Sequence, residues 1–130
     1  TTFDGRYYSS IRGVGGRITL LGTEEIAQAA HCGFNAIAHE FAHQVQETAM
    51  GPEDLSALRA LYRTAVKEGR TLDYYAAADV YEYFAVGYEA FVSPYKRPLA
   101  VVTAGHTRRE LLDRDPQLYA YISSLGRRAP

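Results

Sequence analysis

The chain has 130 residues, of which 47% are hydrophobic and 22% charged, and its formal net charge is -1. This length fits a single domain over residues 1–130 and is too short for two. The balanced charge provides no basic field for nucleic acid or an anionic bilayer, and no apolar run approaches the roughly 20 residues that cross a membrane. We therefore expect neither nucleic acid nor a membrane among its partners, and the oligomeric state stays open.

The cysteine content and the first residues bear on the compartment. Cys32 is the only cysteine, so an internal disulfide is impossible and a small disulfide-stapled secreted protein is excluded. The chain starts without a charged segment followed by an apolar one, and this pattern favours a cytoplasmic location. Because the first residue is Thr1 rather than Met, we expect the domain to be cut from a longer polypeptide.

The first 33 residues favour one strand and one helix. Residues 1–16 are rich in turn formers. The segment 17–21 is short, contains β-branched residues and stops at a glycine, which together favour a strand. Thr23 can cap a helix that begins with two glutamates, where the helix dipole favours acidic residues, and that ends near Gly33.

Helical patterns fill most of the remaining chain. We expect helices over 34–49, over 52–69, within 75–91, and in two short segments that follow Thr107 and Asp115. The start of the helix within 75–91 is ambiguous, because Asp79 followed three residues later by Glu82 resembles a capping box.

Two of these helices have an unusual composition. The helix over 34–49 has almost no wide polar face, and the helix within 75–91 is again apolar nearly all round. Not one Lys or Arg lies between Tyr74 and Tyr95. Helices of this kind belong in the core of a domain, so the few ionisable groups that they carry need a chemical reason to be there.

His39-Glu40-Phe41-Ala42-His43 has the pattern His-Glu-x-x-His. Two His four residues apart lie one turn above each other on a helix, so both imidazoles can reach one metal ion. Glu40 lies about 100° around the helix from His39, where it could take a proton from water at the metal. A zinc ion would satisfy these polar groups, which would otherwise cost several kcal/mol to bury, so the sequence predicts one catalytic Zn2+.

A catalytic zinc ion needs a third protein ligand and one open position. The downstream candidates are Asp79, Glu82, Glu89 and His106. We favour Glu82, because a carboxylate in apolar surroundings without a nearby cation requires either a proton or a metal. The alternative is that Glu82 only closes a capping box with Asp79.

A tyrosine hydroxyl near the metal could donate a hydrogen bond to the oxyanion that forms on a substrate carbonyl. Five of the eleven tyrosines lie between Tyr74 and Tyr88, and most of them are expected to be packing residues. The spacing alone does not decide among Tyr74, Tyr75 and Tyr81.

Two segments carry a family resemblance. The segments GFNAIAHEFAHQV (33–45) and YAAADVYEYFAV (75–86) resemble zinc metallopeptidases of the Mlc titration factor A (MtfA) type and are similar to the catalytic domain of anthrax lethal factor. Both are gluzincin-like, with two His from one helix and a Glu from a second. The resemblance covers roughly residues 15–95, and it is specific because two separated motifs agree in order and in internal spacing.

The resemblance implies a role for each matching residue. It assigns His39, His43 and Glu82 as zinc ligands, Glu40 as the general base and Tyr75 as the oxyanion donor. The implied fold is α+β and predominantly helical, a zincin-like (gluzincin) core with a small β-sheet whose edge strand precedes the active-site helix.

The chain departs from the family pattern at one position. Members usually carry Asp three residues after the second His, and this chain has Gln46 there. An amide can orient a metal ligand through a hydrogen bond but adds no charge, so zinc affinity or activity would be lower. Asp79 could supply the missing charge near the ligands, or it could simply cap its helix.

The resemblance also implies a binding site for the substrate. In peptidases of this kind, a strand edge beside the metal holds the substrate as an added β-strand. The matching position here comprises Arg17, Ile18, Thr19 and Leu20. The same strand could instead be paired only within a small sheet.

Two functions from different classes follow. The first is a zinc metallopeptidase that hydrolyses peptide bonds in a peptide or protein substrate, as an endopeptidase or in an aminopeptidase-like way. The second is a weak or inactive pseudo-peptidase whose zinc is structural and whose strand edge binds a partner peptide. The presence of both Glu40 and Tyr75 favours the enzyme, because a structural zinc site needs neither, whereas Gln46 weakly favours the binding module.

Overall fold

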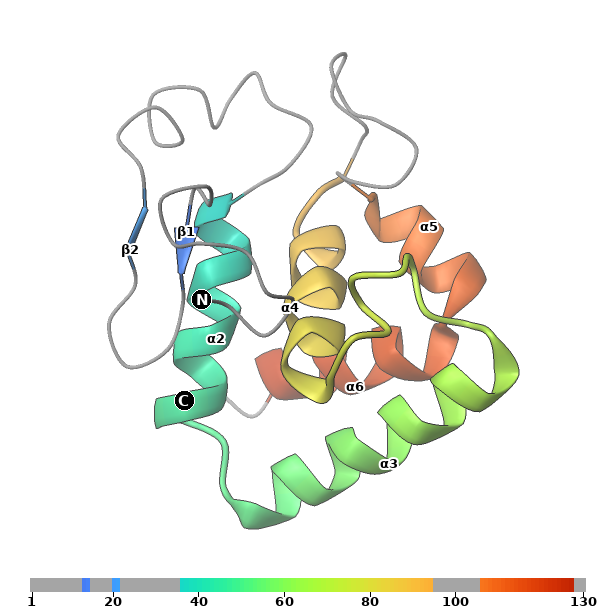
Figure 1. The fold of residues 1–130 in the computed structure, drawn as a ribbon, viewed down its shortest axis with the longest axis horizontal. Helices are drawn as coiled ribbons and strands as arrows, with labels where there is room; N and C mark the ends of the chain where they lie inside the picture. The colour runs from blue at the N-terminus through green and yellow to red at the C-terminus, as the bar shows by residue number, and fades with distance from the viewer. Residues whose placement is uncertain (1–12, 15–19, 22–35, 95–105, 128–130) are drawn as a thin grey trace.

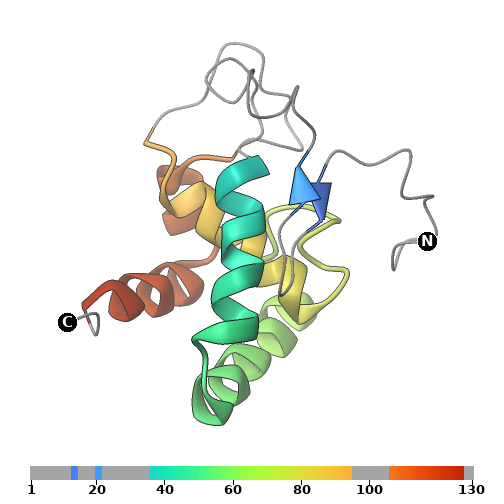
Figure 2. The same cartoon turned by 90° about the vertical axis from the view of Figure 1, so that its left-hand side faces the viewer.

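The computed structural model describes residues 13–14, 20–21, 36–94 and 106–127, and these residues form a helical domain (Figure 1). Its elements are β1 (Gly13–Val14), β2 (Leu20–Leu21), α2 (Ala36–Thr48), α3 (Pro52–Glu68), α4 (Val80–Phe91), α5 (Arg108–Arg114) and α6 (Pro116–Arg127). Helices α2 and α4 lie side by side in Figures 1 and 2, and they make the most extensive contact between any two elements. Among the described residues, no helix is both long enough and apolar enough to cross a membrane.

The predicted fold class is wrong. The sequence predicted an α+β, zincin-like (gluzincin) core with a small β-sheet, whereas the part of the chain that the structure describes is built from helices. Its only β pairing joins Gly13 to Leu21 and Val14 to Leu20, beside α2 and on the side away from α4 (Figure 1). Two residues per strand cannot cover a core face, so helices alone bury the described apolar side chains. The expected helix over 24–33 and most of the expected strand 17–21 lie outside the described residues.

The helix predictions from residue 36 onward are confirmed, and residues 34–35 of the helix predicted over 34–49 lie outside the described residues. Asp79 caps α4 by accepting a hydrogen bond from the Glu82 N–H at 2.8 Å, which settles where that helix begins. The side chain of Thr107 caps α5 with Glu110 in a reciprocal capping box. Helix α3 ends at Gly69, whose φ of 69° is the left-handed conformation that glycine adopts most easily.

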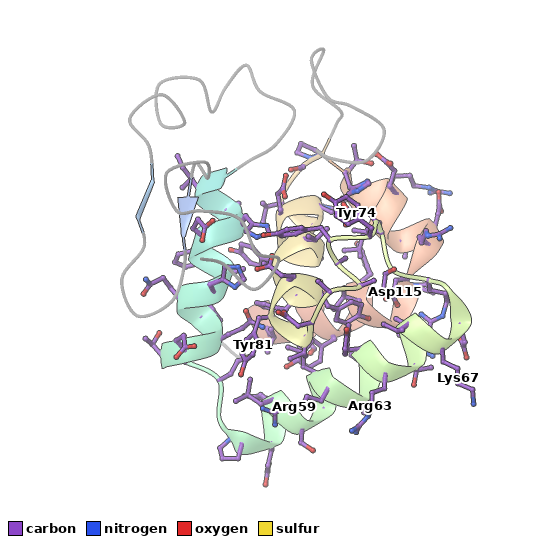
Figure 3. All side chains as sticks on the ribbon, viewed as in Figure 1. Arg59, Arg63, Lys67, Tyr74, Tyr81 and Asp115 are labelled. Atoms are coloured by element: carbon purple, nitrogen blue, oxygen red, sulfur yellow. The ribbon has the colours of Figure 1, made fainter. Side chains whose placement is uncertain are left out.

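Helix α4 occupies the centre of the core, as its apolar composition predicts. It contributes Tyr83, Phe84, Ala85 and Ala90 to a cluster of buried residues from the surrounding helices, which add Ala42, Leu58, Ala65, Leu111, Leu118 and Ile122. Helix α3 is amphipathic, with Leu58 and Ala65 buried while Arg63 and Lys67 point away from the domain (Figure 3). Helix α2 is less enclosed than its composition predicts, because Ile37 and Phe41 are 44% and 52% exposed.

Gly87 sets how closely α4 approaches α6. A Cβ atom at this position would lie 2.5 Å from Leu118 Cδ2 and 3.2 Å from Leu118 Cγ. We expect Gly87→Ala to lower the free energy of unfolding, because overpacking costs about 1–3 kcal/mol and the gain in helix propensity is only about 1 kcal/mol. Gly126→Ala on α6 is the matched control, since nothing lies within 4 Å of its added methyl group. Equal urea midpoints for the two variants would contradict this packing argument.

Candidate metal centre

The structure brings together the three residues predicted as metal ligands. His39 and His43 project from successive turns of α2, and Glu82 projects from the first turn of α4. The Nε2 atom of His39 lies 3.0 Å from Glu82 Oε2, and the Nε2 atom of His43 lies 3.3 Å from Glu82 Oε1. The contact between α2 and α4 therefore joins residues that are 43 and 39 positions apart in the chain.

The donor set fits a divalent cation. One donor atom from each of His39, His43 and Glu82 can be chosen so that all lie within 4.8 Å of one another. Two ligands about 2.1 Å from one tetrahedral ion lie about 3.4 Å apart, close to the separations between the imidazole nitrogens and the carboxylate. Two imidazoles and one carboxylate are also the ligand types of known catalytic zinc sites.

The electrostatics of the group favour a positive charge between its members. Burial lowers the pKa of His39, but its hydrogen bond to Glu82 and the charges of Glu82 and Glu89 outweigh burial and raise it to about 9. Burial raises the pKa of Glu82, but its hydrogen bonds and charge interactions with His39 and His43 outweigh burial and lower it to about 2. The site therefore attracts a cation, which can be a proton or a metal ion.

Glu40 lies beside the ligands rather than among them. Its side chain comes from α2, is 6% exposed, and has one buried oxygen, Oε2, without a hydrogen-bond partner among the described residues. Burial raises the pKa of Glu40, while the charges of His39 and His43 oppose this shift. A buried carboxylate with an unsatisfied oxygen beside a cation site can accept a proton from a water molecule there.

The structure distinguishes among the three candidate tyrosines. Tyr75 contacts α2, with its ring centroid 6.2 Å from that of His39. Tyr74 packs edge-on against Tyr75 and is 80% exposed. Tyr81 is also exposed and lies well away from Tyr74 in Figure 3. Tyr75 is therefore the tyrosine that the structure places beside a candidate ligand.

Two predicted supporting residues have different positions. Gln46 is buried, and its Oε1 lies 3.2 Å from His43 Nδ1, the ring nitrogen that faces away from Glu82. Asp79 instead caps α4 through the backbone of Glu82, so it fixes the ligand's main chain rather than its carboxylate. These contacts orient the ligands from both helices.

Sequence reasoning missed the part that Glu89 plays. This buried residue was considered only as a ligand, yet its Oε2 lies 3.8 Å from His39 Nδ1, opposite the nitrogen that contacts Glu82. Glu89 follows Glu82 by seven residues, a spacing that returns to the same face of a helix after two turns. This spacing, in a helix without Lys or Arg, is the sequence feature that could have predicted a carboxylate next to the ring of a metal ligand.

The other candidate residues lie elsewhere. His106 is not in the metal group but contacts Asp73. Of the predicted substrate-binding strand, Arg17, Ile18 and Thr19 lie outside the described residues, and Leu20 pairs with Val14.

Comparisons with protein-family models, with curated proteins and with solved structures find no match for this chain. The resemblance to the MtfA type and to anthrax lethal factor therefore stays a prediction. Its support is the two motifs together with the geometry that joins His39, His43 and Glu82.

Proposed function

We propose that this protein is a zinc-dependent peptidase. The observation that carries the proposal is the meeting of His39, His43 and Glu82 at the contact between α2 and α4, with buried Glu40 beside them. A structural zinc site usually has four protein ligands, whereas three ligands leave a position for water or substrate.

Each residue has a defined task in this proposal. When bound, a zinc ion supplies Lewis acidity, which polarises a carbonyl group and acidifies a nearby water molecule. The carboxylate of Glu40 accepts the proton of the attacking water and later gives it to the leaving amine. The hydroxyl of Tyr75 donates a hydrogen bond to the oxyanion. The hydrogen bond of Gln46 holds the ring of His43 in the orientation that ligation requires, and the charge of Glu89 lies 3.8 Å from the far side of the His39 ring.

The first test is zinc binding. We expect one zinc ion per chain, and we expect His43→Ala and Glu82→Gln each to weaken zinc affinity by more than the roughly 10- to 100-fold typical of residues that only orient ligands. Glu47→Gln is the matched control, because Glu47 is an exposed carboxylate on the same helix as the two histidines. Metal analysis after dialysis, and competition with a chromogenic chelator, would measure both effects.

The second test is cleavage of a mixed peptide library by the wild-type chain, with and without a chelator. We expect cleavage that the chelator abolishes and that added zinc restores. A chain that binds no zinc would overturn the site. A chain that binds zinc tightly and cleaves nothing would overturn the enzyme and support a peptide-binding module instead.

A further inference from the structure

A second cluster of ionisable residues lies outside the metal group. His106, which the sequence offered as a candidate metal ligand, is buried, with 5% of the residue exposed. His106 Nε2 lies 2.9 Å from Asp73 Oδ2, and His106 Nδ1 lies 3.5 Å from Glu110 Oε2. The cluster therefore joins the start of α5 to the segment 70–79, which connects α3 to α4.

Asp73 also shapes the segment that carries Tyr75. Its second oxygen, Oδ1, accepts a hydrogen bond from the Ala76 N–H at 2.8 Å, which closes a turn around Tyr75. One residue further on, the Ala77 carbonyl accepts a hydrogen bond from the Tyr62 hydroxyl of α3 at 2.7 Å. Asp73 thus uses one carboxylate oxygen to form the turn and the other to bind the turn to His106.

We propose that Asp73 and His106 form a positioning pair that keeps Tyr75 beside His39. The proposal rests on the proposed function, in which the Tyr75 hydroxyl donates to the oxyanion. Tyr75 comes from a connecting segment rather than from a helix, so its place depends on the contacts that fix that segment. A misplacement of about 1 Å can cost on the order of 10²-fold in rate, so such a contact has a measurable effect on catalysis.

The charges around His106 give the pair a dependence on pH. The hydrogen bond to Asp73 raises the pKa of His106 against the opposing effect of burial, and Glu110 raises it further. Asp73 from the connecting segment and Glu110 from α5 are the charged groups within 4 Å of the ring among the described residues. Because the folded pKa of His106 is raised, the protonated ring is present at the ordinary histidine pKa of 6.5 and is lost as the pH rises through the raised pKa.

The decisive experiment combines His106→Ala with Tyr75→Phe. We expect His106→Ala to lower kcat by about 10- to 100-fold with unchanged zinc content and KM. In the Tyr75→Phe background, where no hydroxyl remains to be positioned, the same substitution should lower kcat by less than twofold. Additive losses would overturn the proposal, because they would show that His106 acts by another route.

Two further readouts separate positioning from a general loss of structure. We expect the wild-type kcat to decline as the pH rises through the raised pKa of His106, because the charged pair is then lost. His106→Gln keeps a donor for Asp73 but cannot lose a proton, so it should restore most of the activity and remove this decline. Asp113→Ala, which removes an exposed carboxylate of α5, is the control and should change neither the activity nor its pH dependence. A decline that persists in His106→Gln over the pH range in which His106 loses its proton would contradict the positioning role of His106.

Amide hydrogen exchange tests the pair without any activity. His106→Ala should speed exchange of the Ala76 amide, which the Asp73 carboxylate now protects, and leave exchange within α3 unchanged. Unchanged exchange at Ala76 would overturn the positioning role. If the wild-type chain cleaves no peptide, the proposed function fails, while the exchange measurement still decides whether the pair fixes the turn.

Discussion

Glu40→Gln is expected to lower peptide hydrolysis by about 10²–10⁴-fold while zinc remains bound, because a general base contributes about that much to the rate. The substitution keeps the size of the side chain and removes only its ability to accept a proton. Glu40 is buried beside the ligands, so the loss of its charge leaves the three donor groups on α2 and α4 in place. Steady-state kinetics together with metal analysis of the same sample would measure both parts of the expectation.

The matched control for this variant is Glu47→Gln, an isosteric change at an exposed position of the same helix, which should keep full activity. Wild-type turnover in Glu40→Gln would refute Glu40 as the base. A loss of zinc in that variant would make Glu40 a ligand or a structural residue instead.

Asp115→Ala is expected to lower the free energy of unfolding by about 3 kcal/mol, because it removes a fully buried carboxylate that accepts three hydrogen bonds, one of them from a guanidinium. Asp115 is 0% exposed and lies inside the domain (Figure 3). Its carboxylate accepts hydrogen bonds from the Arg70 guanidinium at 2.6 Å, the Tyr83 hydroxyl at 2.5 Å and the Leu118 N–H at 3.2 Å. Without it, the Tyr83 hydroxyl loses its acceptor, and the part-buried guanidinium of Arg70 keeps only Glu68 and Gln117.

Urea denaturation of Asp115→Ala and Asp113→Ala would compare the loss of a buried carboxylate with the loss of an exposed one. Asp113 also pairs with an arginine, Arg109, but its side chain is 58% exposed and that of Arg109 is 77% exposed. The exposed pair should contribute no more than about 1 kcal/mol. Similar losses for the two variants would show that burial of Asp115 does not determine its effect. Tyr83→Phe should fall between them, because it removes one hydrogen bond and leaves the ion pair.

The part of the site that could be predicted is the part that local spacing determines. His39, Glu40 and His43 follow from helical periodicity within five residues. Glu82 could be chosen because a carboxylate in an apolar helix without basic residues is conspicuous in the sequence.

The remaining contacts depend on how distant segments pack. The contact of Glu89 with His39 requires the register of α2 against α4, which no local pattern contains. The choice of Tyr75 over Tyr74 depends on a turn between helices, and the burial of His106 depends on Asp73, 33 residues earlier in the chain. The fold class was wrong for a related reason: residues 17–21 have strand propensity, but a sheet also needs long-range partners, and the described pairing extends over two residues per strand.

The imidazole of His39 has a consequence for how α2 and α4 can move. One ring nitrogen contacts Glu82 and the other lies near Glu89, so a single side chain lies between two carboxylates whose main chains are about 10 Å apart along the axis of α4. If α4 shifted by one residue, about 1.5 Å along its axis and 100° around it, both carboxylates would leave the ring together. The two contacts of His39 therefore depend on the register of α4 against α2. Insertion or deletion of one residue between positions 82 and 89 should be far less tolerated than a substitution there.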